Sequence, residues 1–166
     1  MDRYVVSILS ENFAKLGVGT FEDVNVPTKV VFHELVDDNI VFVACGDRHS
    51  VFLTSKGRAY VTGANFNYQL GLGHNVNINK PTLIEQLVMK KIRRASCGSR
   101  HTVLISAKGR MYSAGFGAFG QLGHGDFEDK QAYKKIENDW FCSSCSSKEH
   151  VNVALSSEFE GTFTFF

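Results

Sequence analysis

Cys45-Gly46-Asp47-Arg48-His49-Ser50 and Cys97-Gly98-Ser99-Arg100-His101-Thr102 are two copies of one pattern, 52 residues apart. The same spacing relates four more pairs of glycines, namely Gly57 and Gly109, Gly63 and Gly115, Gly71 and Gly123, and Gly73 and Gly125. Chance does not hold one spacing through so many positions. The sequence therefore contains an internal repeat, which is the first signal to settle because it decides the fold.

Each repeat is expected to form four short strands separated by turns. In the second copy we expect strands at residues 92–96, 101–106, 110–114 and 131–136. Lys108-Gly109 is the expected hairpin turn, in which glycine supplies a positive φ. Four strands in a period of about 50 residues are typical of one propeller blade. The sequence predicts an all-β fold, a partial, open β-propeller of about three four-stranded blades.

The repeat divides the chain into four segments. They are residues 1–38 as an incomplete first blade, 39–90 as the second, 91–139 as the third, and 140–166 as the decayed start of a further blade. In the last segment we expect Cys145 and His150 near the places of Cys97 and His101, with one residue inserted. Because a ring closes with four to eight blades, we expect either a piece of a longer protein or a shortened form. Open propeller edges would then favour self-association or a covering partner.

These motifs resemble the repeats of the regulator of chromosome condensation family. Its Gly-x-x-His strand start, its Gly-x-x-Tyr/Trp-x-x-Gly hairpin and its Gly-Gln-Leu-Gly segment correspond here to residues 45–50, 57–63 and 67–73, and again to 97–102, 109–115 and 119–125. The resemblance implies a non-enzymatic scaffold for protein–protein interaction, binding through loops on one propeller face. The residues expected to hold the repeat together are Gly46, His49, Gly57, Gly63, Gly71, Gly98, His101, Gly109, Gly115 and Gly123.

The candidate partner-binding residues are Asp47, Arg48, Ser99 and Arg100. In the family member that exchanges nucleotide on a Ran-type GTPase, acidic residues of this loop contact the GTPase, and Asp47 matches that type of position. The resemblance places all four residues on one face. Two alternatives remain: a guanine-nucleotide exchange or regulatory factor for a small GTPase, although the bare 52-residue period leaves no room for an inserted wedge, and a propeller fragment of a ubiquitin-ligase or kinase-linked protein.

Catalytic, metal and cofactor patterns are weak. Residues 115–120 match G-x-G-x-x-G, but the Gln-Leu-Gly-His-Gly that follows cannot begin the helix of a dinucleotide site. Cys142 and Cys145 form a C-x-x-C without the second pair that a zinc site needs. No nucleophile with its base, no paired acids and no P-loop can be picked out. We expect no enzyme, no metal and no cofactor.

Charge and hydropathy indicate where such a protein would work. The formal net charge is +1, so no overall field favours nucleic acid or an anionic membrane. Residues 90–94, Lys-Lys-Ile-Arg-Arg, are the one basic cluster and are expected to be a solvated strand edge. No apolar run approaches the roughly 18 residues of a membrane span. We therefore expect a protein partner in the cytoplasm or nucleus.

Overall fold

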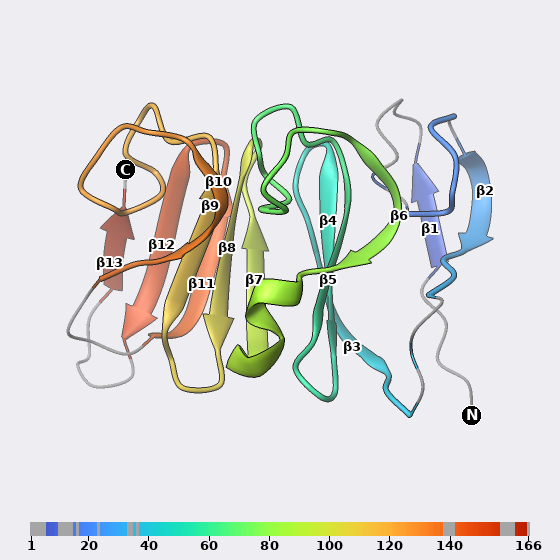
Figure 1. Ribbon diagram of the computed structural model, residues 1–166, viewed down its shortest axis with the longest axis horizontal. Helices are drawn as coiled ribbons and strands as arrows, with labels where there is room; N and C mark the ends of the chain where they lie inside the picture. The colour runs from blue at the N-terminus through green and yellow to red at the C-terminus, as the bar shows by residue number, and fades with distance from the viewer. Residues whose placement is uncertain are drawn as a thin grey trace.

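The strands form four antiparallel sheets in the part of the chain that the computed structural model describes, residues 6–9, 15, 17–22, 24–32, 35, 37–137, 142–156 and 162–165. The sheets stand side by side along the long axis of the molecule (Figure 1). The first consists of β1 (Val6–Leu9) and β2 (Val24–Lys29), and the second of β3 (Ile40–Cys45), β4 (His49–Thr54), β5 (Ala59–Gly63) and β6 (Ile78–Leu83). A 3₁₀ turn, η1 (Glu85–Lys90), leads to the third, β7 (Ile92–Cys97), β8 (His101–Ser106), β9 (Met111–Gly115) and β10 (Lys130–Lys135). The fourth consists of β11 (Cys142–Lys148), β12 (Val151–Ser156) and β13 (Thr162–Phe165).

Every sheet is a meander, because its strand order follows the chain. β7 packs against β3 and β4 of the sheet before it, and β11 packs against β7 and β8. The first strands β3, β7 and β11 of successive sheets therefore lie next to one another. This confirms the predicted all-β, partial open propeller, and the four strands expected after residue 91 lie within one residue of their predicted starts and ends. The blade boundaries at residues 38, 90 and 139 stay a prediction. Within the described residues no helix has the length and hydropathy to cross a membrane.

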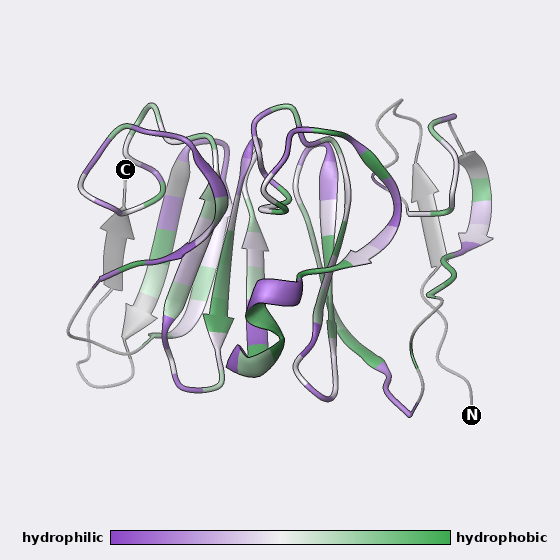
Figure 2. Ribbon diagram, viewed as in Figure 1, coloured by the Kyte–Doolittle hydropathy of each residue, from purple (hydrophilic) through white to green (hydrophobic). Residues whose placement is uncertain are grey.

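Both faces of the second strands are buried, because each central sheet has a neighbour on either side. Alternate residues of a strand point to opposite faces. On β8, Leu104 joins the core shared with the second sheet, whereas Val103 and Ile105 join the core shared with the fourth. On β4, Phe52 packs edge-on against Phe32 at a centroid distance of 5.2 Å, on the side of the first sheet. Figure 2 shows the resulting concentration of apolar residues along the strands.

Glycine turns also join the sheets through the backbone. The nitrogen of Ile92 donates to the carbonyl of Gly57 at 2.9 Å, and the nitrogen of Cys142 donates to the carbonyl of Gly109 at 2.9 Å. The starts of the third and fourth sheets are thus each fixed to the β-hairpin turn of the preceding sheet. Since the same bond recurs at two junctions, the repeat in sequence is also a repeat in packing.

The expected alignment of Cys145 with Cys97 and of His150 with His101 is wrong. Strand pairing places Ser147 opposite Asn152, as Cys97 lies opposite Thr102. The fourth sheet therefore follows the third at a spacing of 50 residues, and Val151 stands where His101 stands. The matching cysteine and histidine are coincidental. The register of the fourth sheet is set instead by the backbone pairing and by the buried amide of Asn152.

Candidate functional site

Two short loops join the first and second strands of the central sheets. Residues 46–48 connect β3 to β4, and residues 98–100 connect β7 to β8. Asp47, Arg48 and Arg100 are exposed, and Ser99 is partly exposed. The histidine that follows each loop is fully buried. Each loop therefore presents its last two residues to solvent while a buried side chain anchors it from beneath.

His49 anchors the first loop to the neighbouring sheet. Its Nε2 lies 2.8 Å from Thr102 Oγ1, and that hydroxyl donates to the carbonyl of Gln69 at 2.7 Å. Because a hydroxyl has one proton to give, His49 must be the donor and carries its hydrogen on Nε2. Burial, then the nearby His101 and Lys15, lowers the pKa of His49 to about 3. The imidazole is therefore neutral at physiological pH.

His101 repeats this arrangement one sheet later. Its Nε2 lies 2.8 Å from Asn152 Oδ1, and the amide nitrogen of Asn152 donates to the carbonyl of Gln121. Burial lowers the pKa of His101, although the hydrogen bond that its Nε2 donates to Asn152 acts in the opposite direction. At both junctions a histidine and a Gln-Leu-Gly segment of one sheet are thus joined through a polar side chain of the next. We call this arrangement the histidine bridge.

The histidine bridge explains why glycine starts the loop. A Cβ on Gly98 would overlap the ring of His101. In the fourth sheet Val151 takes the place of His101, and Lys148 takes the place of Gly98. Where the ring is absent the glycine is absent too, so the two residues form one packing unit.

The remaining repeat glycines lie at turns and close approaches. Gly63 and Gly115 have φ of 114°, and a Cβ on either would lie within 2.7 Å of the backbone around His49 or His101. Six of the ten expected structural positions have positive φ: Gly57, Gly63, Gly71, Gly109, Gly115 and Gly123. Gly63 and Gly115 let the third strands approach the loops closely, whereas Gly57 and Gly109 lie in the hairpin turns at the other end of the sheets.

The four residues singled out from the sequence surround one depression. Asp47, Arg48, Ser99 and Arg100 line a hollow of about 190 Å³, whose wall is completed by residues of the 64–69 segment. The structure thus brings together two loops that are 52 residues apart in sequence. A backbone bond of 3.2 Å from Ser99 to the carbonyl of Glu149 continues the row toward the fourth sheet.

Aromatic side chains that the sequence analysis did not single out extend this face. Arg100 Cζ lies 5.9 Å from the ring centroid of Phe116, and the Phe119 ring lies 5.7 Å from Phe116 and 4.6 Å from His150. Phe119 is 55% exposed, and Phe66 beside the depression is 58% exposed. The sequence signal for these exposed aromatic residues is a large apolar side chain inside a glycine-rich loop. Such a side chain is outside the strands, whose side chains form the buried core.

Three of the four cysteines, Cys97, Cys142 and Cys145, are poorly suited to metal or redox chemistry. Burial raises the pKa of Cys97, raises that of Cys142 to about 11, and together with Cys142 raises that of Cys145 to about 12. A thiol that keeps its proton at neutral pH is a weak nucleophile and a weak ligand. In the described ranges no group of three or more His, Cys, Asp or Glu is placed to hold a metal ion.

Meandering sheets around an axis, joined by a repeated histidine bridge, define a β-propeller repeat protein. The family model of the regulator of chromosome condensation (RCC1) repeat matches residues 10–53 and 56–105. A second model of the same repeat matches residues 40–69 and 92–121. The chain belongs to this family, as the resemblance of its motifs predicted.

Relatives with different roles share this similarity. The chain is 37% identical over 112 residues to the X-linked retinitis pigmentosa GTPase regulator of Canis lupus familiaris. This match covers 68% of the chain and 11% of the relative. It is also 34% identical over 122 residues to the E3 ubiquitin-protein ligase HERC2 of Homo sapiens. That match covers 71% of the chain and 2% of the relative. The chain thus spans a small part of each of these relatives.

Solved propellers have the same fold. Prp20p of Saccharomyces cerevisiae, a protein with binding properties toward Gsp1p and histones, superposes with a TM-score of 0.85 at 22% identity. The superposition covers 94% of this chain and 40% of Prp20p. At this identity the likeness establishes the fold, and the chain corresponds to less than half of that propeller.

Proposed function

We propose that this chain is a protein-binding scaffold and that its partner docks over the depression formed by Asp47, Arg48, Ser99 and Arg100. One observation carries the proposal: two distant loops place these exposed side chains around a single hollow, while fully buried histidines hold the loops from beneath. A rigid loop loses little conformational freedom on binding. Arginine and exposed aromatic residues, such as Phe66 and Phe119, are also the residue types enriched at interaction hot spots.

The proposed role is non-enzymatic. The bases closest in sequence to the loops are His49 and His101, and both are fully buried with Nε2 bonded to the next sheet. A general base must reach the proton that it removes. These imidazoles instead support a loop whose exposed side chains are suited to recognition.

Regulation of a small GTPase is the second candidate. It is favoured by the name of the canine relative, a GTPase regulator, and by the binding of Prp20p to Gsp1p. Asp47 and the two arginines offer both signs of charge, which suits a polar GTPase surface. The HERC2 similarity supports the other alternative, a propeller segment within a ubiquitin ligase.

Site-specific photo-crosslinking tests the docking face. A benzophenone side chain replacing Ser99 is expected to crosslink a partner that the same group replacing Lys80, on outer strand β6, does not. The partner is then purified, and its affinity is measured for Asp47→Arg/Arg100→Glu and for the charge-matched control Lys80→Glu/Glu85→Arg. We expect binding to weaken at least about tenfold in the first variant and to be unchanged in the control. Equal affinities would reject this face.

A nucleotide-release assay separates the two candidates. The chain is added to a panel of Ran-type and Rab-type GTPases loaded with a fluorescent nucleotide. Accelerated release that disappears in Asp47→Arg/Arg100→Glu supports GTPase regulation. Binding without acceleration supports the scaffold alone.

A further inference from the structure

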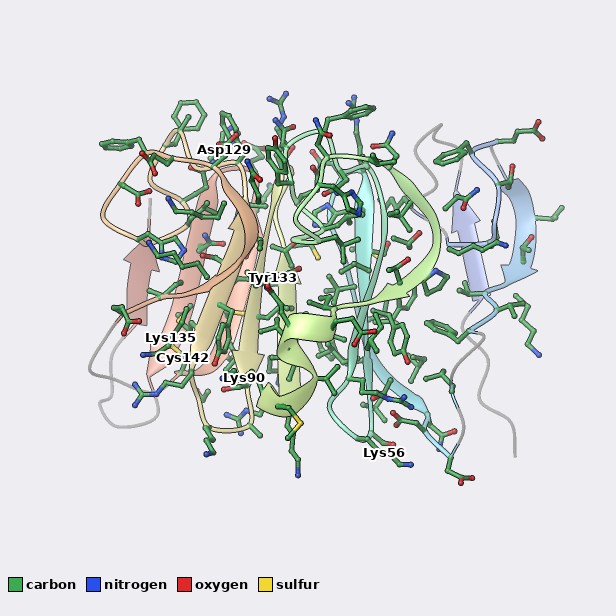
Figure 3. The ribbon with its side chains drawn as sticks, viewed as in Figure 1. Lys56, Lys90, Asp129, Tyr133, Lys135 and Cys142 are labelled. Atoms are coloured by element: carbon green, nitrogen blue, oxygen red, sulfur yellow. The ribbon has the colours of Figure 1, made fainter. Side chains whose placement is uncertain are left out.

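A larger hollow lies at the opposite end of the two central sheets, away from the Gly-x-x-His loops. Its volume is about 650 Å³, and it is lined by the β4–β5 hairpin turn, the start of β7 and Ala107 in the β8–β9 turn. Figure 3 shows Lys56 and Lys90 at this lower end of the sheets. Asp129, which accepts a bond from Gly117 in the glycine-rich segment, lies at the upper end in the same view. The two hollows share no lining residue, so they are separate sites.

Four exposed cationic side chains line this hollow: Lys56, Lys91, Arg93 and Arg94. The residues that line it include no carboxylate. Among the described residues, the ion pairs involve other cations, so no carboxylate of the described chain neutralises these four. Unbalanced charge concentrated in a concave site attracts an anionic ligand.

Asp38 does not reduce this positive charge, because its own charge is balanced elsewhere. Its buried carboxylate lies 2.9 Å from Arg58 Nε and accepts bonds from Ser55 Oγ at 2.7 Å and from the backbone nitrogen of Lys56 at 3.0 Å. Although burial disfavours the charge, bonds from Thr54, Ser55, Lys56 and Arg58 lower the pKa of Asp38 to about 2. Asp38 therefore fixes the hairpin turn that forms one wall of the hollow.

The hollow is also preformed and partly apolar. Its walls are tied by the bond from Ile92 to the Gly57 carbonyl at 2.9 Å and by a 2.7 Å bond from Ala107 to the Lys91 carbonyl. Leucine, isoleucine and valine side chains contribute to the lining, and Val41 among them is 54% exposed. A rigid site with an apolar part beside positive charges suits a ligand that carries both apolar and anionic groups.

The backbone pairing of the first strands does not require arginine at positions 93 and 94. By strand pairing, the positions equivalent to Arg93 and Arg94 hold Val41 and Phe42 in the second sheet. In the fourth sheet they hold Ser143 and Ser144. The same structural positions thus accept apolar, cationic and hydroxyl side chains. The cations are a feature of this one junction. Arg93 also donates to the Cys142 carbonyl of the fourth sheet at 3.5 Å, so its side chain contacts that sheet as well as lining the hollow.

We propose that this hollow binds an acidic peptide segment, with Asp or Glu carboxylates on the four cations and an apolar side chain on the exposed surface of Val41. A peptide is favoured over nucleic acid because no aromatic side chain lines the hollow, and single-stranded nucleic acid is usually held by stacking on aromatic rings. The net charge of +1 also provides little general attraction for phosphate backbones.

Fluorescence anisotropy with a short labelled peptide of alternating Glu-Glu and Leu residues tests this site. The matched peptide has Gln in place of every Glu. We expect the Glu peptide to bind the whole chain, and Arg93→Ser/Arg94→Ser to weaken it about tenfold. These serines occur at the equivalent positions of the fourth sheet, so the variant is expected to fold. Lys80→Ser/Lys134→Ser removes the same charge from exposed positions on outer strands and is expected to bind as the parent does.

Three results would overturn the proposal: equal binding of the Glu and Gln peptides, equal affinity of Arg93→Ser/Arg94→Ser and the parent, or stronger binding of a labelled oligonucleotide than of the Glu peptide. The last result would indicate a nucleic-acid site. Asp47→Arg/Arg100→Glu alters the other face and is expected to leave peptide binding unchanged. Failure of this proposal and failure of the proposed function can therefore be distinguished.

Discussion

Replacing Thr102 with valine removes one hydroxyl from the middle of the first histidine bridge and preserves the shape of the side chain. The hydroxyl accepts from His49 at 2.8 Å and donates to the Gln69 carbonyl at 2.7 Å. Thr102 is fully buried, so water cannot replace either bond without opening the junction. The variant leaves one buried donor and one buried acceptor without a partner.

The expected cost follows from these two groups. An unsatisfied buried polar group costs about 1–3 kcal/mol, and the added methyl group recovers about 0.8 kcal/mol of apolar burial. Thr102→Val should therefore lower the free energy of unfolding by about 3 kcal/mol. For a chain of this size that corresponds to a fall in Tm of roughly 6–12 °C.

Urea and thermal unfolding followed by circular dichroism measure this effect. Thr82→Val is the control, because the Thr82 hydroxyl bonds only locally, to the Lys80 carbonyl at 3.2 Å near the surface, and its loss should change stability by less than about 0.5 kcal/mol. Thr102→Ser keeps the hydroxyl and should recover most of the loss. If Thr102→Val is as stable as Thr82→Val, the histidine bridge contributes nothing to the junction and the reasoning fails.

Three further outcomes are expected. The free energy of unfolding should fall by about 2 kcal/mol between pH 6.5 and pH 5 through His49, because the imidazole takes up a proton in the unfolded chain but not in the folded chain, where its pKa is about 3. His101 acts in the same direction. Urea midpoints that stay constant over this pH range would contradict the prediction. Gly98→Ala should cost about 2 kcal/mol by overpacking against the His101 ring, whereas Lys148→Ala at the equivalent position should be nearly neutral in thermal melts. Asp38→Asn should cost about 2 kcal/mol at pH 7 by breaking a buried ion pair, and the difference from the parent should disappear as pH falls from 3.8 through the lowered pKa of about 2.

The fold was predictable because the repeat contains residues with geometric requirements. A glycine such as Gly63 or Gly115, at φ of 114°, cannot be replaced without strain, so it recurs at a fixed spacing. His101 recurs with Gly98 because the ring of one occupies the space of the other's missing side chain. Such positions reveal strands and turns before any coordinates are known.

Sequence identity misaligns the fourth sheet because these markers are absent there. With Val151 in place of histidine and Lys148 in place of glycine, sequence identity had only Cys145 and His150 to follow. Backbone pairing has no sequence signal of its own. The register of the fourth sheet is marked by Asn152, which stands where the third sheet has Thr102. Its amide accepts from His101 and donates to the Gln121 carbonyl, as the hydroxyl does at the preceding junction.

The binding surfaces were harder to predict, because they occupy positions that the fold leaves open. The two exposed loop positions hold Asp47 and Arg48 in the second sheet, Ser99 and Arg100 in the third, and Glu149 and His150, after Lys148 instead of glycine, in the fourth. Their backbone is held by the histidine bridge or by the hairpin, so their side chains can vary without changing the strands. The start of the first strand has the same freedom at the opposite end, where Arg93 replaces Val41. Recognition should therefore depend on the residues that differ between repeats, and a partner should distinguish one junction from the next even though the backbones at these junctions are equivalent.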